Sequence, residues 1–148
     1  MQDRETKLAQ KPKVLIVDDD NEIVRGASIR LRAAGYDVIA AHDGEAGYNA
    51  ALQHHPDAII LDLRMPVMDG WTMLATLHKH EETKAIPAVV LSANVVDREG
   101  GKAMDLGASC FLEKPYEAKR LVKAIEFVMG ESAKKRSNQA GSKREMHH

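Results

Sequence analysis

Short apolar runs alternate with longer segments of mixed polarity along most of this 148-residue chain. The runs have the length of strands buried on both faces, and the segments between them repeat apolar residues at helical spacing. We expect strands at residues 14–17, 37–41, 58–62, 86–91 and 109–112. We expect helices at residues 21–34, 43–53, 71–80, 97–106 and 116–129. This alternation predicts an α/β protein in which one five-stranded parallel sheet is flanked by five helices.

The central run, residues 58–61, leads directly into Asp62. Burial of an unpaired carboxylate is costly, so Asp62 is expected at the point where this strand ends. In open α/β sheets, ligands bind at the carboxyl ends of the strands. We therefore interpret Asp62 as the functional carboxylate of the chain.

Polar residues follow other strands in the same way. Asp18 to Asp20 follow the first strand, Ser92 the fourth and Lys114 the fifth. Parallel strands end at one edge of a sheet, so these side chains are expected to converge with Asp62. Carboxylates held together raise one another's pKa, and oxygen ligands without Cys or His suit Mg²⁺. An aspartate nucleophile, Mg²⁺, a lysine and a hydroxyl together suit phosphoryl transfer.

Local signals refine the helices. Asp20 suits the N-cap of the first helix, and Gly35 suits the left-handed position just past its end. In the second helix Ala46 and Ala50 are expected to face the core. We interpret His54-His55-Pro56 as the end of that helix rather than as a metal site.

Composition places the chain among ordinary globular proteins, with 44% hydrophobic and 29% charged residues. The net charge of -1 does not suggest nucleic acid or membrane as a partner, and no apolar run approaches the length of a membrane span. The single cysteine, Cys110, excludes an internal disulfide and lies in an apolar run as a small hydrophobe. The N-terminus has no apolar core for a signal peptide, so we expect a cytoplasmic protein.

The ends of the chain differ from its centre. Residues 1–12 are polar and are expected to form a flexible lead-in to a domain at 13–130. Residues 131–148 carry five Lys/Arg against two Asp/Glu and few apolar residues. We expect this basic tail or linker to be disordered or partly helical, with the final His pair resembling a purification-tag remnant.

Four motifs in order resemble the receiver domain of response regulators in two-component signalling, of the chemotaxis-regulator type. They are Val17-Asp18-Asp19-Asp20, Leu61-Asp62-Leu63-Arg64-Met65-Pro66-Val67-Met68-Asp69-Gly70, Leu91-Ser92-Ala93 and Phe111-Leu112-Glu113-Lys114-Pro115. The resemblance covers about residues 13–130. It implies the flavodoxin-like receiver fold with strand order 2-1-3-4-5, an order that is taken from the family and not from the pattern of the chain.

The resemblance also implies roles. Asp62 would accept a phosphoryl group, assisted by Lys114 and Ser92, in a domain that promotes its own phosphorylation and dephosphorylation but is not an enzyme in the usual sense. Asp18, Asp19, Asp62 and the backbone carbonyl of Arg64 would hold Mg²⁺, with Mn²⁺ or Ca²⁺ as substitutes.

Further roles concern the response to phosphorylation. Ser92 and Phe111 would form the conformational switch, although Phe111 stands where many receivers have tyrosine. Arg64 and Asn94 would tune the lifetime of the phosphoryl group. The Lys114–Pro115 peptide bond would be cis.

The implied partners are a histidine kinase or histidine phosphotransfer protein as donor and a protein as downstream target. Nucleic acid and membrane are not expected as partners within this chain, which would be a monomer or a phosphorylation-dependent dimer. No output domain fits after residue 130, so the chain is either a stand-alone receiver or a segment of a larger regulator.

Other interpretations of the same residues stay open. A Mg²⁺-dependent hydrolase of the haloacid dehalogenase kind shares these residue types, but it places a second acid where this chain has Arg64. A degenerate receiver would bind partners without accepting phosphate. Asp18 to Asp20 also fit helix capping alone.

Overall fold

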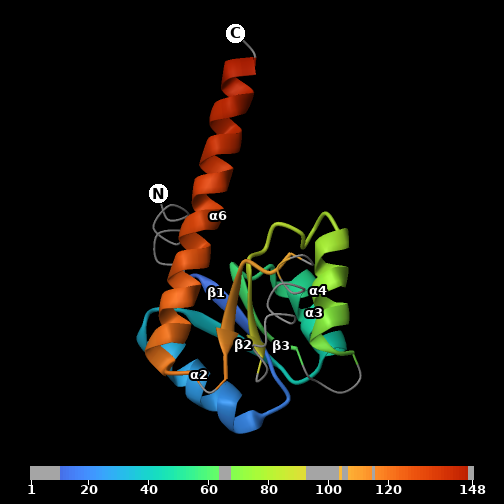
Figure 1. Ribbon diagram of the computed structural model, residues 1–148, viewed down its shortest axis with the longest axis vertical. Coiled ribbons are helices and arrows are strands. Elements are labelled where there is room, and N and C mark those ends of the chain that lie inside the picture. Colours follow the sequence, from blue (N-terminus) through green and yellow to red (C-terminus); the bar gives the residue numbers. More distant parts are fainter. Residues whose placement is uncertain (1–10, 64–67, 93–103, 105–106, 115, 147–148) are drawn as a thin grey trace, which may run out of the picture.

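The computed structural model describes residues 11–63, 68–92, 104, 107–114 and 116–146, with side chains up to residue 132. All five strands are parallel and form one sheet in the order β2-β1-β3-β4-β5 (Figure 1). The strands are β1 (Lys13–Val17), β2 (Asp37–Ala41), β3 (Ala58–Asp62), β4 (Ala88–Ser92) and β5 (Cys110–Glu113). The predicted parallel sheet and its strand order are confirmed.

Four helices accompany the sheet in the described part of the chain. They are α2 (Asn21–Ala33), α3 (Gly44–His54), α4 (Gly70–Lys79) and α6 (Ala118–Met146). The prediction of five flanking helices is therefore corrected to four among the described residues. The missing one was predicted at residues 97–106, which lie outside the described residues except for Met104.

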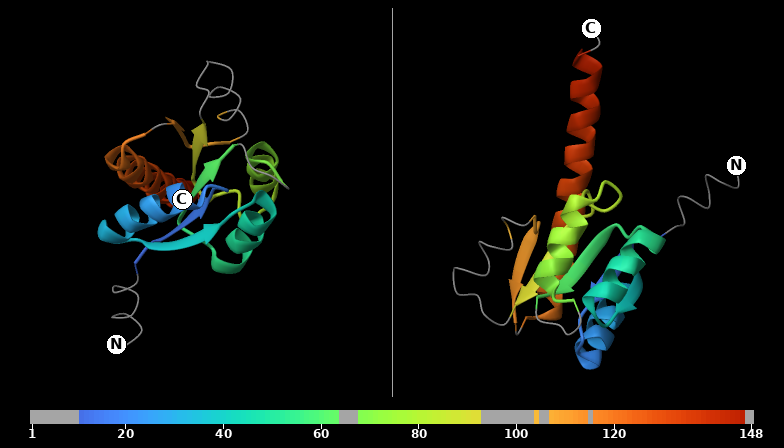
Figure 2. Two further views of the ribbon diagram at one scale, coloured as in Figure 1. Left: turned by 90° about the horizontal axis from the view of Figure 1, so that it is seen from below. Right: turned by 90° about the vertical axis from the view of Figure 1, so that its right-hand side faces the viewer.

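Helices cover both faces of the sheet, with α2 and α6 on one side and α3 and α4 on the other (Figure 2). Neighbouring residues of β1 point to opposite faces: Leu15 packs in the core beneath α3 and α4, and Ile16 in the core beneath α2 and α6. Both side chains are almost completely buried. This two-sided burial is why the strands are continuous apolar runs rather than alternating ones.

Aspartates begin three of the helices. Asp20, Asp43 and Asp69 are the N-caps of α2, α3 and α4, and each side chain accepts a backbone N–H of the first turn at 2.8–3.3 Å. These bonds satisfy amides that have no partner within the helix. The predicted cap at Asp20 is confirmed, and so is the left-handed Gly35, with φ of 101°.

The buried face of α3 differs from the prediction. Ala46 is exposed and Ala50 only partly buried, whereas Gly47 and Ala51 are buried. The helix lies so close to β1 and α4 that the residues facing them are the smallest ones available. The end of α3 at His54 agrees with its interpretation as a helix end, and His55 caps it in the left-handed conformation.

The last helix is longer than expected. It begins at Ala118 rather than at 116 and continues to Met146, through the tail from residue 131 that was expected to be disordered or partly helical (Figure 1). Residues 131–136 are mostly good helix formers, and a helix that is already packed onto the domain propagates at little cost. No helix in the described part of the chain is both long and apolar enough to cross a membrane.

Candidate functional site

Two strand ends bring three carboxylates together. Asp62 is the last residue of β3, and Asp18 follows β1, whose Val17 pairs with Leu61 of β3. One carboxylate oxygen from each of Asp18, Asp19 and Asp62 lies within 4.8 Å of the others. Asp18 and Asp62 are buried and Asp19 is exposed, so the cluster opens to solvent on one side.

Lys114 joins this cluster at the same edge of the sheet, from the end of the outermost strand, β5. Its Nζ lies 3.3 Å from Oδ2 of Asp18 and 3.3 Å from Oδ2 of Asp62. The backbone holds the lysine in place, because its N–H donates to the carbonyl of Ser92 at the end of β4 (2.8 Å). The ammonium group thus bridges two carboxylates that would otherwise repel each other.

Burial shapes the ionisation of the cluster. It raises the pKa of the Asp18 carboxyl from 3.8 to about 6, and the charge of Asp62 adds to the rise. The N–H of Asp20 and the ammonium of Lys114 act in the opposite direction. Burial by itself would lower the pKa of Lys114, but Asp18 and Asp62 outweigh it and the pKa is raised. The folded protein therefore holds Asp18 ionised at neutral pH against a desolvation cost.

The donor set fits a hard divalent cation. With all groups ionised, three carboxylates and one ammonium leave the cluster with a net charge of −2. Oxygen ligands with no sulfur or imidazole favour Mg²⁺ over softer metals. Mg²⁺ takes ligands at about 2.0–2.1 Å, which places ligand atoms up to about 4.2 Å apart, so modest side-chain adjustment suffices.

The remaining predicted residues are less fully described. Ser92 is buried at the end of β4, one residue beyond Leu91, which pairs with Asp62. Phe111 is half-buried in β5 and packs against the core on the α3 and α4 side. Arg64, Asn94 and Pro115, and with it the predicted cis peptide bond, lie outside the described residues.

Sequence reasoning missed Tyr116, two residues after Lys114. Burial raises the pKa of its hydroxyl to about 12, with smaller contributions from Asp18, Asp62 and Asp20. Tyr116 therefore lies close enough to the acidic cluster for the charges of these carboxylates to act on its hydroxyl. Only its position two residues after Lys114 pointed to it in the sequence.

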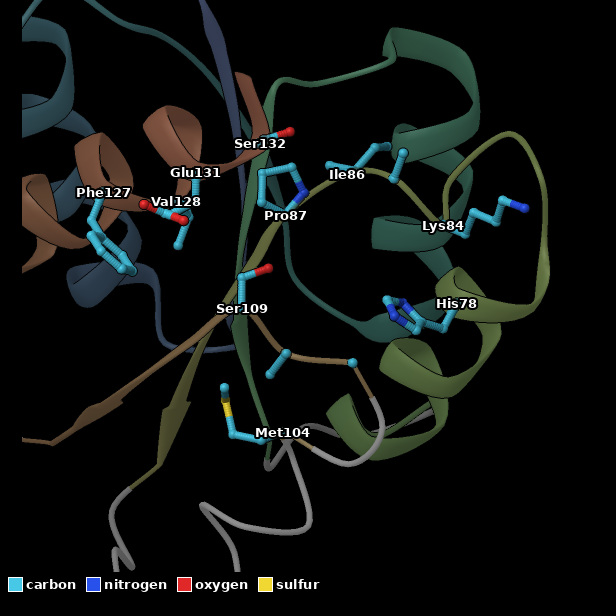
Figure 3. Close-up of a pocket in the computed structure, with 13 residues that line it drawn as sticks. His78, Lys84, Ile86, Pro87, Met104, Ser109, Phe127, Val128, Glu131 and Ser132 are labelled. Atoms are coloured by element: carbon cyan, nitrogen blue, oxygen red, sulfur yellow. The ribbon is translucent and has the colours of Figure 1, made fainter. Parts of the chain in front are cut away.

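Two hollows lie in different places relative to the cluster. A largely apolar groove of about 550 Å³ between α2 and α6 is lined by Lys114 and Tyr116 together with Ile23, Ala27 and Leu121. A second cavity, of about 450 Å³, is lined by residues such as Pro87 and Ser109, which precede β4 and β5 (Figure 3). It therefore lies at the opposite edge of the sheet from Asp62. Of the two hollows, the groove is the one that adjoins the cluster.

A parallel sheet in this order, with a lysine-bridged acidic cluster at its carboxyl edge, defines the class of receiver-like signalling domains. Comparison with known proteins agrees. Residues 14–126 match the family model of the response regulator receiver domain. The chain belongs to this family, whose general function is a phosphorylation-dependent switch within two-component response regulators.

Individual relatives support the assignment. The DNA-binding dual master transcriptional regulator RpaA of Synechocystis sp. is 37% identical over 118 residues, which cover 80% of this chain and 49% of that protein. The chain spans about half the length of the curated relatives that it matches.

Solved structures agree in fold. A putative response regulator from Chloroflexus aurantiacus J-10-fl is 31% identical with a TM-score of 0.78, covering 82% of this chain and 99% of that one. The receiver domain of sensor histidine kinase PA1611 from Pseudomonas aeruginosa PAO1 is 26% identical with a TM-score of 0.76, covering 82% and 99%. That structure has a magnesium ion coordinated in its active-site cleft.

Proposed function

We propose that Asp62 accepts a phosphoryl group and that the resulting change in the domain controls a partner protein. The observation that carries this proposal is the contact of Lys114 Nζ with both Asp18 and Asp62, 3.3 Å from each. A lysine held between two buried carboxylates at a sheet edge can also pair with an incoming anionic group, because its charge need not be brought in from solvent.

The chemical step follows from the residues. A carboxylate oxygen of Asp62 attacks phosphorus, a new P–O bond forms, and the bond from phosphorus to the donor nitrogen breaks with its electron pair going to the donor. Lys114 pairs with phosphoryl oxygens, and Ser92 donates its hydroxyl to one of them. Asp18 and Asp19, with Asp62 and the Arg64 carbonyl, would hold Mg²⁺, which supplies charge neutralisation at the phosphoryl oxygens when bound.

The switch would start at Ser92. A hydroxyl drawn toward the phosphoryl group leaves space that the half-buried Phe111 is able to fill from the neighbouring strand. The phenylalanine ring offers no hydroxyl to a partner, so its contribution would be through packing. Arg64 and Asn94 are proposed to tune the lifetime of the phosphoryl group.

The donor is proposed to be a histidine kinase or histidine phosphotransfer protein. In support, the apolar groove between α2 and α6 reaches Lys114 and would give a protein donor a surface beside the acceptor. The downstream partner is proposed to be a protein, and the domain at residues 13–130 to work in the cytoplasm.

The proposal predicts phosphorylation at one position. After incubation with Mg²⁺ and acetyl phosphate, intact-mass measurement is expected to give a single phosphoryl adduct per chain. The adduct should vanish in Asp62→Ala, because the carboxylate that β3 presents to Lys114 is then gone, and should vanish when EDTA removes the metal. Asp37→Asn, which changes an exposed aspartate at the start of β2, serves as the control and should retain the adduct.

The amount of phosphate released separates the alternatives. A receiver consumes about one phosphoryl group per chain and then loses it slowly, whereas a hydrolase releases phosphate continuously. Steady release over many equivalents would support the hydrolase. An adduct that persists in Asp62→Ala would refute Asp62 as the acceptor.

A further inference from the structure

The first residue of α3 is in close contact with the segment between β3 and α4. The N–H of Gly44, the first residue of α3, donates to the carbonyl of Met68 (3.1 Å). A Cβ at Gly44 would overlap that carbonyl oxygen and lie 2.9 Å from the carbonyl carbon. Real Cβ atoms essentially never come closer than 3.0 Å to another atom, so only glycine fits this contact.

On one side of this contact, a short stretch of chain leads to Asp18. Gly44 lies three residues after Ala41, the last residue of β2. The carbonyl of Ala41 accepts the N–H of Asp18 at 3.1 Å. Residues 42 and 43 thus connect Gly44 to the strand end that binds the backbone of a buried carboxylate, Asp18.

On the other side, a short stretch leads to Asp62. Met68 lies two residues before Gly70, whose N–H donates to the carbonyl of Leu63 (3.0 Å). The Cα of Gly70 is packed so tightly against the backbone of Asp62 that a Cβ would overlap the Asp62 carbonyl oxygen. Met68 is thus connected to the backbone of Asp62 through Asp69 and Gly70, by backbone atoms alone.

We infer that Gly44 is a positioning residue for the acidic cluster, because its contact with Met68 joins the segment that is hydrogen-bonded to the Asp18 backbone to the segment that packs on the Asp62 backbone. This inference rests on the proposed Mg²⁺-assisted site. Alanine at 44 forces either the start of α3 or the loop to shift, and both routes end at a carboxylate of the cluster. Loss of a group that is hydrogen-bonded directly to a metal ligand costs about 10–100-fold in affinity, and a backbone contact one step further out is expected at the lower end of that range.

The test is the Mg²⁺ affinity of Gly44→Ala, with Gly35→Ala as the matched control. Gly35 has a positive φ of 101° with open space around it, so alanine there costs stability through backbone strain alone. It lies before β2, at the edge of the sheet opposite the cluster. Both variants should melt at a lower temperature than the parent protein, but only Gly44→Ala should bind Mg²⁺ more weakly, by about 10-fold or more.

Affinity is read by titrating Mg²⁺ while following the fluorescence of Trp71, the only tryptophan, in the first turn of α4. The rise in melting temperature with Mg²⁺ gives a second measure. To keep Gly44→Ala folded, it is made together with Gly26→Ala, whose added Cβ meets no atom within 4 Å in α2.

The outcomes are separable. A parent protein that binds no Mg²⁺ overturns the proposed site itself. If the parent protein binds Mg²⁺ and Gly44→Ala binds it as tightly as Gly35→Ala does, the positioning role is refuted. Equal weakening in Gly35→Ala and Gly44→Ala also refutes it, because general loss of stability would then explain the change.

Discussion

Alanine in place of Gly70 is expected to destabilise the domain by about 3 kcal/mol or more, at the upper end of what overpacking costs. The added Cβ would overlap the carbonyl oxygen of Asp62 and lie 2.5 Å from Cα of Leu63. These are backbone atoms at the end of a central strand, so they cannot rotate away from the added Cβ as a side chain would. Either α4 or the end of β3 has to move.

The comparison is with Gly26→Ala, the same substitution in α2. Gly26 is exposed in the middle of the helix, and its added Cβ meets no atom within 4 Å. Alanine there should stabilise the protein by about 0.5–1 kcal/mol, because it lowers the conformational freedom of the unfolded chain.

Urea unfolding followed by circular dichroism measures both variants. The two changes should move the midpoint in opposite directions. A Gly70→Ala protein as stable as the parent would show that the contact with Asp62 relaxes without cost, and would contradict the prediction.

Asparagine in place of Asp18 is expected to stabilise the metal-free protein while weakening its binding of Mg²⁺. Asp18 is completely buried, and burial raises its pKa to about 6. That rise corresponds to roughly 3 kcal/mol between the protonated and ionised forms. This figure already includes the favourable contact of the ionised carboxylate with Lys114. The buried asparagine amide brings N–H groups that need partners, which offsets part of the gain, so we expect about 1–2 kcal/mol at pH 7.

The gain should depend on pH. The pKa of Asp18 is higher in the folded state than its ordinary value of 3.8, so the folded state binds the proton more tightly. The stabilisation that comes from this tighter proton binding at Asp18 is therefore fully present below about pH 4 and is lost as the pH rises toward 6. The stability difference between Asp18→Asn and the parent protein should be small at pH 4 and largest at pH 7.

Metal binding should change in the opposite sense. Removing one carboxylate of three takes away a ligand or an anchor for a ligand water, so the dissociation constant of Mg²⁺ should rise at least about 10-fold. Mg²⁺ at 100 times its dissociation constant would stabilise the parent protein by about 2.7 kcal/mol, and the variant by much less.

Chemical denaturation at pH 4, 5, 6 and 7, with and without Mg²⁺, tests both parts. Asp37→Asn controls for the loss of one negative charge at an exposed position. The prediction fails if Asp18→Asn is less stable than the parent protein at pH 7 without metal, or if its stability difference does not change with pH.

Much of the fold was predictable because strands that are buried on both faces appear in the sequence as continuous apolar runs. The runs that became β1 and β3 could be placed to within about a residue, and Asp62 at the end of its strand followed from the cost of burying a charge. Convergence of Asp18 and Lys114 with Asp62 followed from parallel strands alone. The strand order required the family resemblance, since alternation does not say which strands are neighbours.

Other features could not be predicted because they depend on how close two elements approach. The pattern of α3 favoured Ala46 and Ala50 as core residues, but the distance to β1 and α4 selected Gly47 and Ala51. The sequence also left open whether the tail is disordered or partly helical, because its residues have little apolar surface to bury. Only continuity with the packed half of α6 favours a helix that extends to Met146.

The sequence by itself determined which residue types lie at the sheet edge, because hydrophobic periodicity and the cost of buried charge act along a single chain. Only the tertiary structure decided that one lysine lies 3.3 Å from two carboxylates and that Gly44 and Gly70 touch backbone on other elements. Such contacts depend on how closely segments of the chain approach in space, and close packing makes them sensitive to a single added carbon atom.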